Sequence, residues 1–154
     1  MYSKILVPID GSETADCALV QAAQLARLGN ATLILLHIIE ETRHTHGFEP
    51  PEVYIHEVRP HFLASGQRLL DDTANRLRSE GLDVKTVLLE SGGKRISDLI
   101  KEQTELLGCD LIVLGTHGRR GIDRLLLGSD AEQTARIAPV PIMLVRLTKA
   151  APTE

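Results

Sequence analysis

Apolar residues along the chain alternate between two spacings, one typical of buried strands and one typical of helices. Residues 4–9 (KILVPI) and 31–39 (ATLILLHII) are short apolar runs rich in β-branched side chains, as expected for strands buried on both faces of a parallel sheet. Between them, the apolar positions of residues 13–28 recur every three or four residues, which predicts a helix. Ser12 stands before this helix as its predicted N-cap, and Gly29-Asn30 gives the stop signal.

The same alternation continues to the end of the chain. Residues 40–54 contain Gly47, Pro50 and Pro51 without any periodicity, so we expect a long connecting loop there. Strands alternating with helices specify a parallel sheet with right-handed crossovers. We therefore predict a single-domain α/β fold, an open parallel five-stranded sheet of order 3-2-1-4-5 with helices on both faces. The further helices are predicted over 58–80, 94–107 and 130–138, and the further strands over 83–89, 110–114 and 141–146.

Composition supports one ordinary globular domain. The chain has 154 residues, of which 43% are hydrophobic and 25% charged, which is the usual mixture for one soluble domain. Aromatic residues make up only 3% and Trp is absent, so the core must consist of Val, Ile, Leu and Ala. We expect the domain to cover residues 1–148 and a polar tail to follow over 149–154.

Net charge, cysteine content and apolar run length indicate which partners and which compartment to expect. The net charge of −4 provides no positive field for a phosphate backbone, so we do not expect a nucleic-acid partner. Cys17 and Cys109 are far apart in a chain whose start lacks an export signal, which predicts reduced, buried thiols and a cytoplasmic protein. No apolar run approaches the roughly 18 residues of a membrane span, so no membrane partner is expected.

The candidate binding site follows from the predicted topology. Open α/β sheets bind ligands beyond the carboxyl ends of their strands, where the strand order reverses. That point lies between the strands at 4–9 and 110–114, which are followed by the polar segments DGS (10–12) and GTHG (115–118). Glycine recurs between residues 115 and 128, just before a predicted helix start. Backbone N–H groups in such a segment can bind phosphate oxygens, which predicts a nucleotide site.

Other interpretations of these residues remain open. Ser129 and Glu132 have the spacing of a capping box, so Ser129 could serve only to start the helix. The sequence contains neither G-x-x-x-x-G-K-[ST] nor G-x-G-x-x-G, which argues against a P-loop NTPase and a standard dinucleotide oxidoreductase. The pair His44-x-His46 has weak metal-ligand spacing, and we predict no metal site. His37 lies in an apolar strand and is expected to be a hydrogen-bonded core residue.

The segment from Gly115 to Ser129 resembles the G-x-x-G-x₉-G-[ST] signature of the universal stress protein family. The similarity extends to KILVPIDGS, LILLHII, CDLIVLGTHGRRG and APVPIMLVR. The resemblance implies a Rossmann-like fold of the adenine nucleotide alpha hydrolase type. It also implies a stress-response module that binds ATP, alone or with Mg²⁺, and that forms a homodimer through the last strand, residues 141–146.

The resemblance also implies roles for individual residues. Asp10 would contact the adenosine, and Pro8 and Ile38 would line the base pocket. His117 would lie beside the phosphates. The remaining ligand contacts, to ribose and phosphates, would come from Gly115, Gly118, Gly128, Ser129 and the backbone N–H of Asp130.

Asp130 departs from the small or apolar residue that is common at its position in the family. Its carboxylate would repel a phosphate unless it turns away or binds Mg²⁺. Alternatively, Asp130 and Glu132 simply complement the dipole of the helix that they begin. Arg119, Arg120 and Arg124 could offset the phosphate charge, although exposed arginines in a loop are commonly only solvated.

Three functions are compatible with these residues. The first is a homodimeric ATP-binding module, whose final strand presents a free edge for pairing. The second is a weak Mg²⁺-dependent ATPase in the same pocket, with Asp10 the nearest candidate for a general base. The third is a dimeric scaffold that acts without a nucleotide.

Overall fold

The structure, a computed structural model, describes residues 1–41, 50–117 and 127–147. Its five strands form one parallel sheet in the order β3-β2-β1-β4-β5, which confirms the predicted order. The predicted tail at 149–154 lies outside the described residues, so the domain boundary stays a prediction. The strands are β1 (Lys4–Pro8), β2 (Thr32–Ile39), β3 (Val84–Glu90), β4 (Leu111–Gly115) and β5 (Ile142–Val145).

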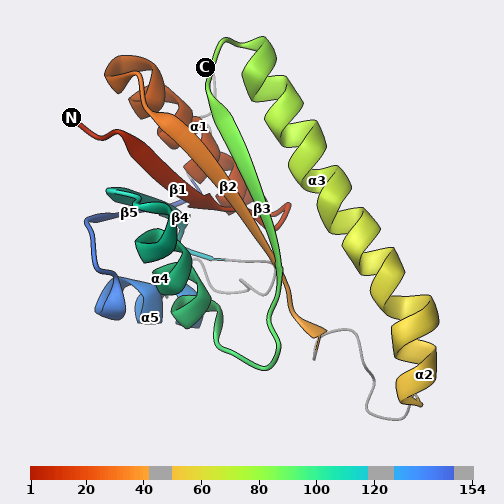
Figure 1. Ribbon diagram of the computed structural model, residues 1–154. Coiled ribbons are helices and arrows are strands. Elements are labelled where there is room, and N and C mark those ends of the chain that lie inside the picture. The colour runs from red at the N-terminus through yellow and green to blue at the C-terminus, as the bar shows by residue number, and fades with distance from the viewer. Residues whose placement is uncertain (42–49, 118–126, 148–154) are drawn as a thin grey trace, which may run out of the picture.

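Helices cover both faces of the sheet, as expected (Figure 1). Helices α1 (Glu13–Gly29) and α3 (Arg59–Ser79) pack on one face, and α4 (Ile96–Leu107) and α5 (Ser129–Ile137) lie side by side on the other. Alternate residues of each strand supply the two cores, because side chains along a strand point to opposite faces. Ile5 and Val7 of β1 join the core under α1 and α3, while Leu6 joins the core under α4.

The helix after β2 begins earlier than its sequence predicts. The first turn α2 (Pro51–Val53) continues through one π-helical turn, η2 (Tyr54–Val58), into α3, so the expectation of a loop up to residue 54 was wrong. Pro51 occupies the first helical turn, where its missing N–H costs nothing and its fixed φ suits the helix. Arg59 then anchors the helix to the end of β3 by a two-pronged ion pair with Glu90, at 2.6 and 2.8 Å.

The helix ends follow the predicted signals closely. The side chain of Ser12 accepts a hydrogen bond of 3.2 Å from the N–H of Ala15, which confirms it as the N-cap of α1. Asn30 ends α1 in the left-handed conformation with φ 50°, one residue beyond Gly29. Gly108 ends α4 in the same way with φ 65°. These caps fix where each helix meets the sheet.

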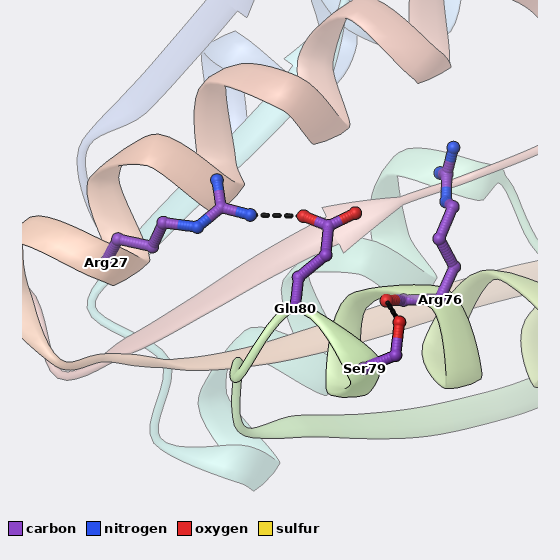
Figure 2. A network of polar contacts seen from close by, with 4 residues as sticks. All are labelled: Arg27, Arg76, Ser79 and Glu80. Carbon is purple, nitrogen blue, oxygen red and sulfur yellow. Dashed lines mark hydrogen bonds and ion pairs between the residues drawn. The ribbon is translucent and has the colours of Figure 1, made fainter.

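The amino ends of the strands are tied together away from the candidate site. Asp110 accepts hydrogen bonds from the backbone N–H groups of Ser3 and Lys4, at 2.8 and 3.0 Å, and joins the start of β1 to the start of β4. Figure 2 shows the Arg27 guanidinium pointing to the Glu80 carboxylate, an ion pair between the ends of α1 and α3. Both side chains are about half exposed, so this pair contributes at most about 1 kcal/mol.

The two cysteines differ in their surroundings. Both thiols are free. Cys109 is buried, and burial raises the pKa of its thiol to about 11. Cys17 is only half-buried, so its predicted burial was wrong; it lies beside the fully buried Ala18, at the border of the inward face of α1. Among the described helices, none has the length and apolar character needed to cross a membrane.

Candidate functional site

The candidate site lies where β1 and β4 run side by side in the middle of the sheet. The chain leaves β1 into α1 on one face and reaches α5 on the other face after β4 (Figure 1). Successive helices depart to opposite faces here, and open α/β sheets bind ligands beyond the carboxyl ends of their strands at such a point. The structure therefore places the segments after β1 and β4 together, as the sequence predicted.

The turn after β1 is held by its own polar side chains. Asp10 accepts a hydrogen bond of 2.9 Å from the backbone N–H of Ser12 through its Oδ1 atom. Gly11, between them, has φ 78°, a conformation that glycine adopts without strain. The carboxylate of Asp10 is thereby fixed in direction at the start of α1, and its contact with a nucleoside stays a prediction.

A contact that the sequence did not reveal joins the segment after β1 to the segment after β4. The Thr14 hydroxyl, in the first turn of α1, donates a hydrogen bond to the backbone carbonyl of His117. Gly115, at the end of β4, lies so close to the same residue that a Cβ atom there would be 2.9 Å from the Thr14 carbonyl oxygen. Glycine at 115 is thus required by packing, and its contact with a ligand stays a prediction. No sequence signal marked Thr14.

The chain returns to the same place after residues 118–126. The N–H of Gly128 donates a hydrogen bond of 2.8 Å to the carbonyl oxygen of Thr116. A Cβ atom on Gly128 would lie 2.9 Å from that oxygen, so only glycine allows this approach. Gly118 lies outside the described residues, as do Arg119, Arg120 and Arg124.

Helix α5 starts without a side-chain cap. Gly128 is its N-cap and Ser129 its first helical residue, so the alternative of a capping box at Ser129 was wrong. Glu132 instead pairs with Arg136 one turn later, at 2.7 Å. The N–H groups of a first helical turn have no acceptor within the helix, and the helix dipole is positive there. The backbone N–H groups of Ser129 and Asp130 belong to this first turn and could therefore donate to an anion.

His117 contains a buried nitrogen that no described residue satisfies. Its Nδ1 atom lies 3.0 Å from the Thr116 hydroxyl, whereas its Nε2 atom is buried without a hydrogen-bond partner among the described residues. Leaving a buried polar atom unpaired costs about 1–3 kcal/mol. An orphaned nitrogen next to the Thr116–Gly128 contact is therefore an atom to which a ligand could hydrogen-bond.

Of the two residues expected to line a base pocket, Ile38 lies on the face covered by α4, and the pocket itself stays a prediction. Ile38 packs against the core that contains Leu6 and Leu36, and Pro8 is paired in register with Leu36. The neighbouring His37 bonds through Nδ1 to the carbonyl oxygen of Ile9, at 2.8 Å, which confirms its predicted hydrogen bond. The ring is only half-buried, so the expectation of a core residue was wrong. Pro8 and Ile38 thus lie on adjacent strands, near the carboxyl end of each.

Sequence and structure comparisons place the chain among known proteins. It is 28% identical over 151 residues to the universal stress protein YxiE of Bacillus subtilis, an alignment that covers 95% of this chain and 100% of YxiE. A solved structure of a universal stress protein family member from Burkholderia pseudomallei has 28% identity and a TM-score of 0.75, with 95% of this chain and 97% of that one covered.

Two further solved structures of the same fold contain nucleotides. The universal stress protein from Archaeoglobus fulgidus in complex with dAMP has a TM-score of 0.62 at 23% identity, over 94% of this chain and 98% of that one. A universal stress protein in complex with cAMP has a TM-score of 0.64 at 23% identity, over 96% and 98%. The model of the universal stress protein family matches residues 1–146, and the chain therefore belongs to that family.

Proposed function

We propose that this universal stress protein binds an adenine nucleotide, ATP alone or with Mg²⁺, and acts as a regulatory stress-response module. The observation that carries the proposal is the contact between Gly128 and Thr116, which sets the uncapped start of α5 beside the end of β4. The amides at such a helix start attract phosphate oxygens. Ser129, the N–H of Asp130 and the orphaned Nε2 atom of His117 are the groups that would receive them.

The other end of the crevice suits the nucleoside. The carbonyl oxygen of Leu36 accepts a hydrogen bond of 2.8 Å from the N–H of Ile9, one residue beyond β1. Carbonyls two residues apart on a strand point the same way, so the carbonyl of Ile38 is directed past the end of β1. An exocyclic amino group of a purine could donate to it, with Asp10 near the ribose. The dAMP and cAMP bound by two structural neighbours support adenine as the base.

A homodimer through the last strand forms part of the proposal. Strand β5 is an edge of the sheet, and its four residues Ile142–Val145 are all only half-buried in the single chain. An edge strand presents unpaired N–H and C=O groups that a second chain can satisfy. Pairing of two β5 edges across a two-fold axis would cover these apolar side chains.

Extracting bound nucleotide from the purified protein distinguishes the proposed binding module from the ATPase and from the scaffold that acts without a nucleotide. Acid release followed by chromatography identifies any nucleotide bound from the cell, and phosphate release is then followed with ATP and Mg²⁺. A bound adenine nucleotide without turnover supports the binding module. Steady turnover that Asp10→Ala abolishes, and that the exposed control Asp72→Ala preserves, would make the protein an ATPase. If no nucleotide is bound and added ATP does not bind either, the dimeric scaffold that acts without a nucleotide is the remaining function.

A further inference from the structure

Strand β3 is the second edge of the sheet, opposite β5. The N–H of Leu33 donates to the carbonyl of Asp83 at 2.9 Å, and the N–H of Ser91 donates to the carbonyl of Ile39 at 2.8 Å. Because the backbone groups of successive strand residues point to opposite sides, the odd-numbered residues of β3 turn theirs to β2 and the even-numbered residues turn theirs outward. These outward groups, which we call the β3 edge, belong to Val84, Thr86, Leu88 and Glu90.

The first outward carbonyl of the β3 edge already has a donor. Arg78, in the last turn of α3, donates to the carbonyl oxygen of Val84 through Nη2 at 2.7 Å and through Nε at 3.2 Å. Hydrogen bonds from a charged donor are about twice as strong as those between neutral groups. A strand that paired with this edge would have to displace the guanidinium from the Val84 carbonyl, so the bond opposes pairing.

A second arginine of α3 holds the opposite end of the same edge. Arg59 makes its two-pronged ion pair with the Glu90 carboxylate, and Figure 1 shows α3 running alongside β3 between the two contacts. Lys85, within the strand, is exposed, and a lysine on an edge strand is a common means of avoiding pairing with another chain. Thr86 and Leu88 present their outward groups between the two arginines.

Strand β5, the other edge, is built differently. Pro141 accepts a hydrogen bond of 3.0 Å from the N–H of Ile112 in β4, so the outward carbonyls of β5 are those of Ile142 and Leu144. Among the described residues, no side chain donates to either of these two carbonyls. The four residues of β5 also carry no charge. The features that oppose pairing at β3 are therefore not repeated at β5 in the described part of the chain.

From these observations we infer that the β3 edge is closed to a second copy of the chain, and that Arg78 closes it together with Arg59. A sheet that is open at both edges can add copies at each of them and grow without limit, whereas a closed edge restricts strand pairing to the other side. The inference goes beyond the proposed dimer through β5 and does not require it, because it concerns the opposite edge. The proposed dimer would stop at two chains for this reason.

Arginine variants in a Leu144→Asp background test the inference on the full chain, because that substitution is expected to block pairing through β5. Arg78→Met removes the guanidinium and keeps an unbranched side chain. Arg78→Met combined with Arg59→Met should associate as the concentration rises, and the mass measured by light scattering should reach about twice that of the background protein or more. The control Arg76→Met removes an exposed arginine of the same helical turn (Figure 2) and should leave a single chain. Circular dichroism establishes that each variant is folded.

Amide hydrogen exchange locates the contact in the associated species. The N–H groups of Thr86 and Leu88 should exchange more slowly in the associated variant than in the background protein, because a paired strand would protect them. Association that leaves these two amides unprotected would overturn the inference. A folded variant that lacks both arginines and stays a single chain at every concentration would overturn it as well.

The wild-type protein gives a second test, which does not depend on the folding of any variant. Raising its concentration should leave the exchange rates of Thr86 and Leu88 unchanged, and protection of these amides would show that the β3 edge is open. Failure of the proposed dimer looks different. In that case the exchange of Ile142 and Leu144 would also be independent of concentration, while the arginine variants would still report on β3.

Discussion

The N–H of Gly128 donates a hydrogen bond of 2.8 Å to the carbonyl oxygen of Thr116, twelve positions earlier in the chain. This bond brings the start of α5 back to the end of β4. The Thr14 hydroxyl contacts the next carbonyl, that of His117, and so attaches the start of α1 to the same point. Three segments that are distant in sequence converge where the proposed site requires phosphate-binding amides.

Gly128→Ala should weaken ATP binding without unfolding the protein. The new Cβ would lie 2.9 Å from the Thr116 oxygen, so the start of α5 must move and its amides lose their alignment. We expect at least a tenfold loss of affinity, on the order of 1.4 kcal/mol, measured by calorimetry. Gly81→Ala is the control: Gly81 has φ 84° in an open turn far from the site, so this variant should lose stability and keep ATP affinity. Equal affinities for both variants would contradict the assignment.

His117→Phe should separate binding from stability. The variant removes the Nε2 atom, which no described residue satisfies, together with the bond between Nδ1 and Thr116. Thr116→Val removes the same bond but keeps Nε2, so it should lose about 1 kcal/mol of stability in chemical denaturation. His117→Phe should lose less than Thr116→Val, because it also removes a buried nitrogen that no described residue satisfies. Only His117→Phe should lose ATP affinity, by roughly tenfold. If the two variants bind ATP equally well, Nε2 has no role in binding.

The fold could be predicted from the sequence because buried parallel strands and helices differ in period. The runs at 4–9 and 31–39 could be assigned for that reason, and the strand order then located the site. The start of the helix at Pro51 was missed because a proline pair is as typical of loops as of a first helical turn. Thr14 was missed because its role depends on the carbonyl of His117, which lies opposite it in space and more than a hundred residues away in the chain.

Acid should weaken the junction between β1 and β4 through Asp110. Burial raises the pKa of this carboxyl, but the hydrogen bonds from Ser3 and Lys4 outweigh it, so that the pKa is lowered from 3.8. The folded state therefore binds the proton less tightly than the unfolded state, and this stabilisation is present above about pH 4 and lost as the pH falls through the lowered value. Denaturation between pH 7 and 3 should show a smaller pH dependence for Asp110→Asn than for wild type. Identical pH profiles would exclude this contribution.

Leu144→Asp should convert a dimer into a monomer. Leu144 is half-buried on the edge strand β5, where a second chain would cover it, and a carboxylate there would be desolvated on pairing. Leu106→Asp is the control, since Leu106 is 76% exposed on α4 and should not affect assembly. Light scattering after size-exclusion chromatography gives the mass of each species. A monomeric wild type at high concentration would contradict pairing through β5.

The most direct test of the account is a two-dimensional amide NMR titration of the wild-type protein with ATP, with and without Mg²⁺. The account predicts that the amide signals of Thr116, His117, Gly128, Ser129 and Asp130 shift together and saturate at one nucleotide per chain. Signals that stay in place at these residues, or that shift only on distant surfaces such as α3, would contradict it.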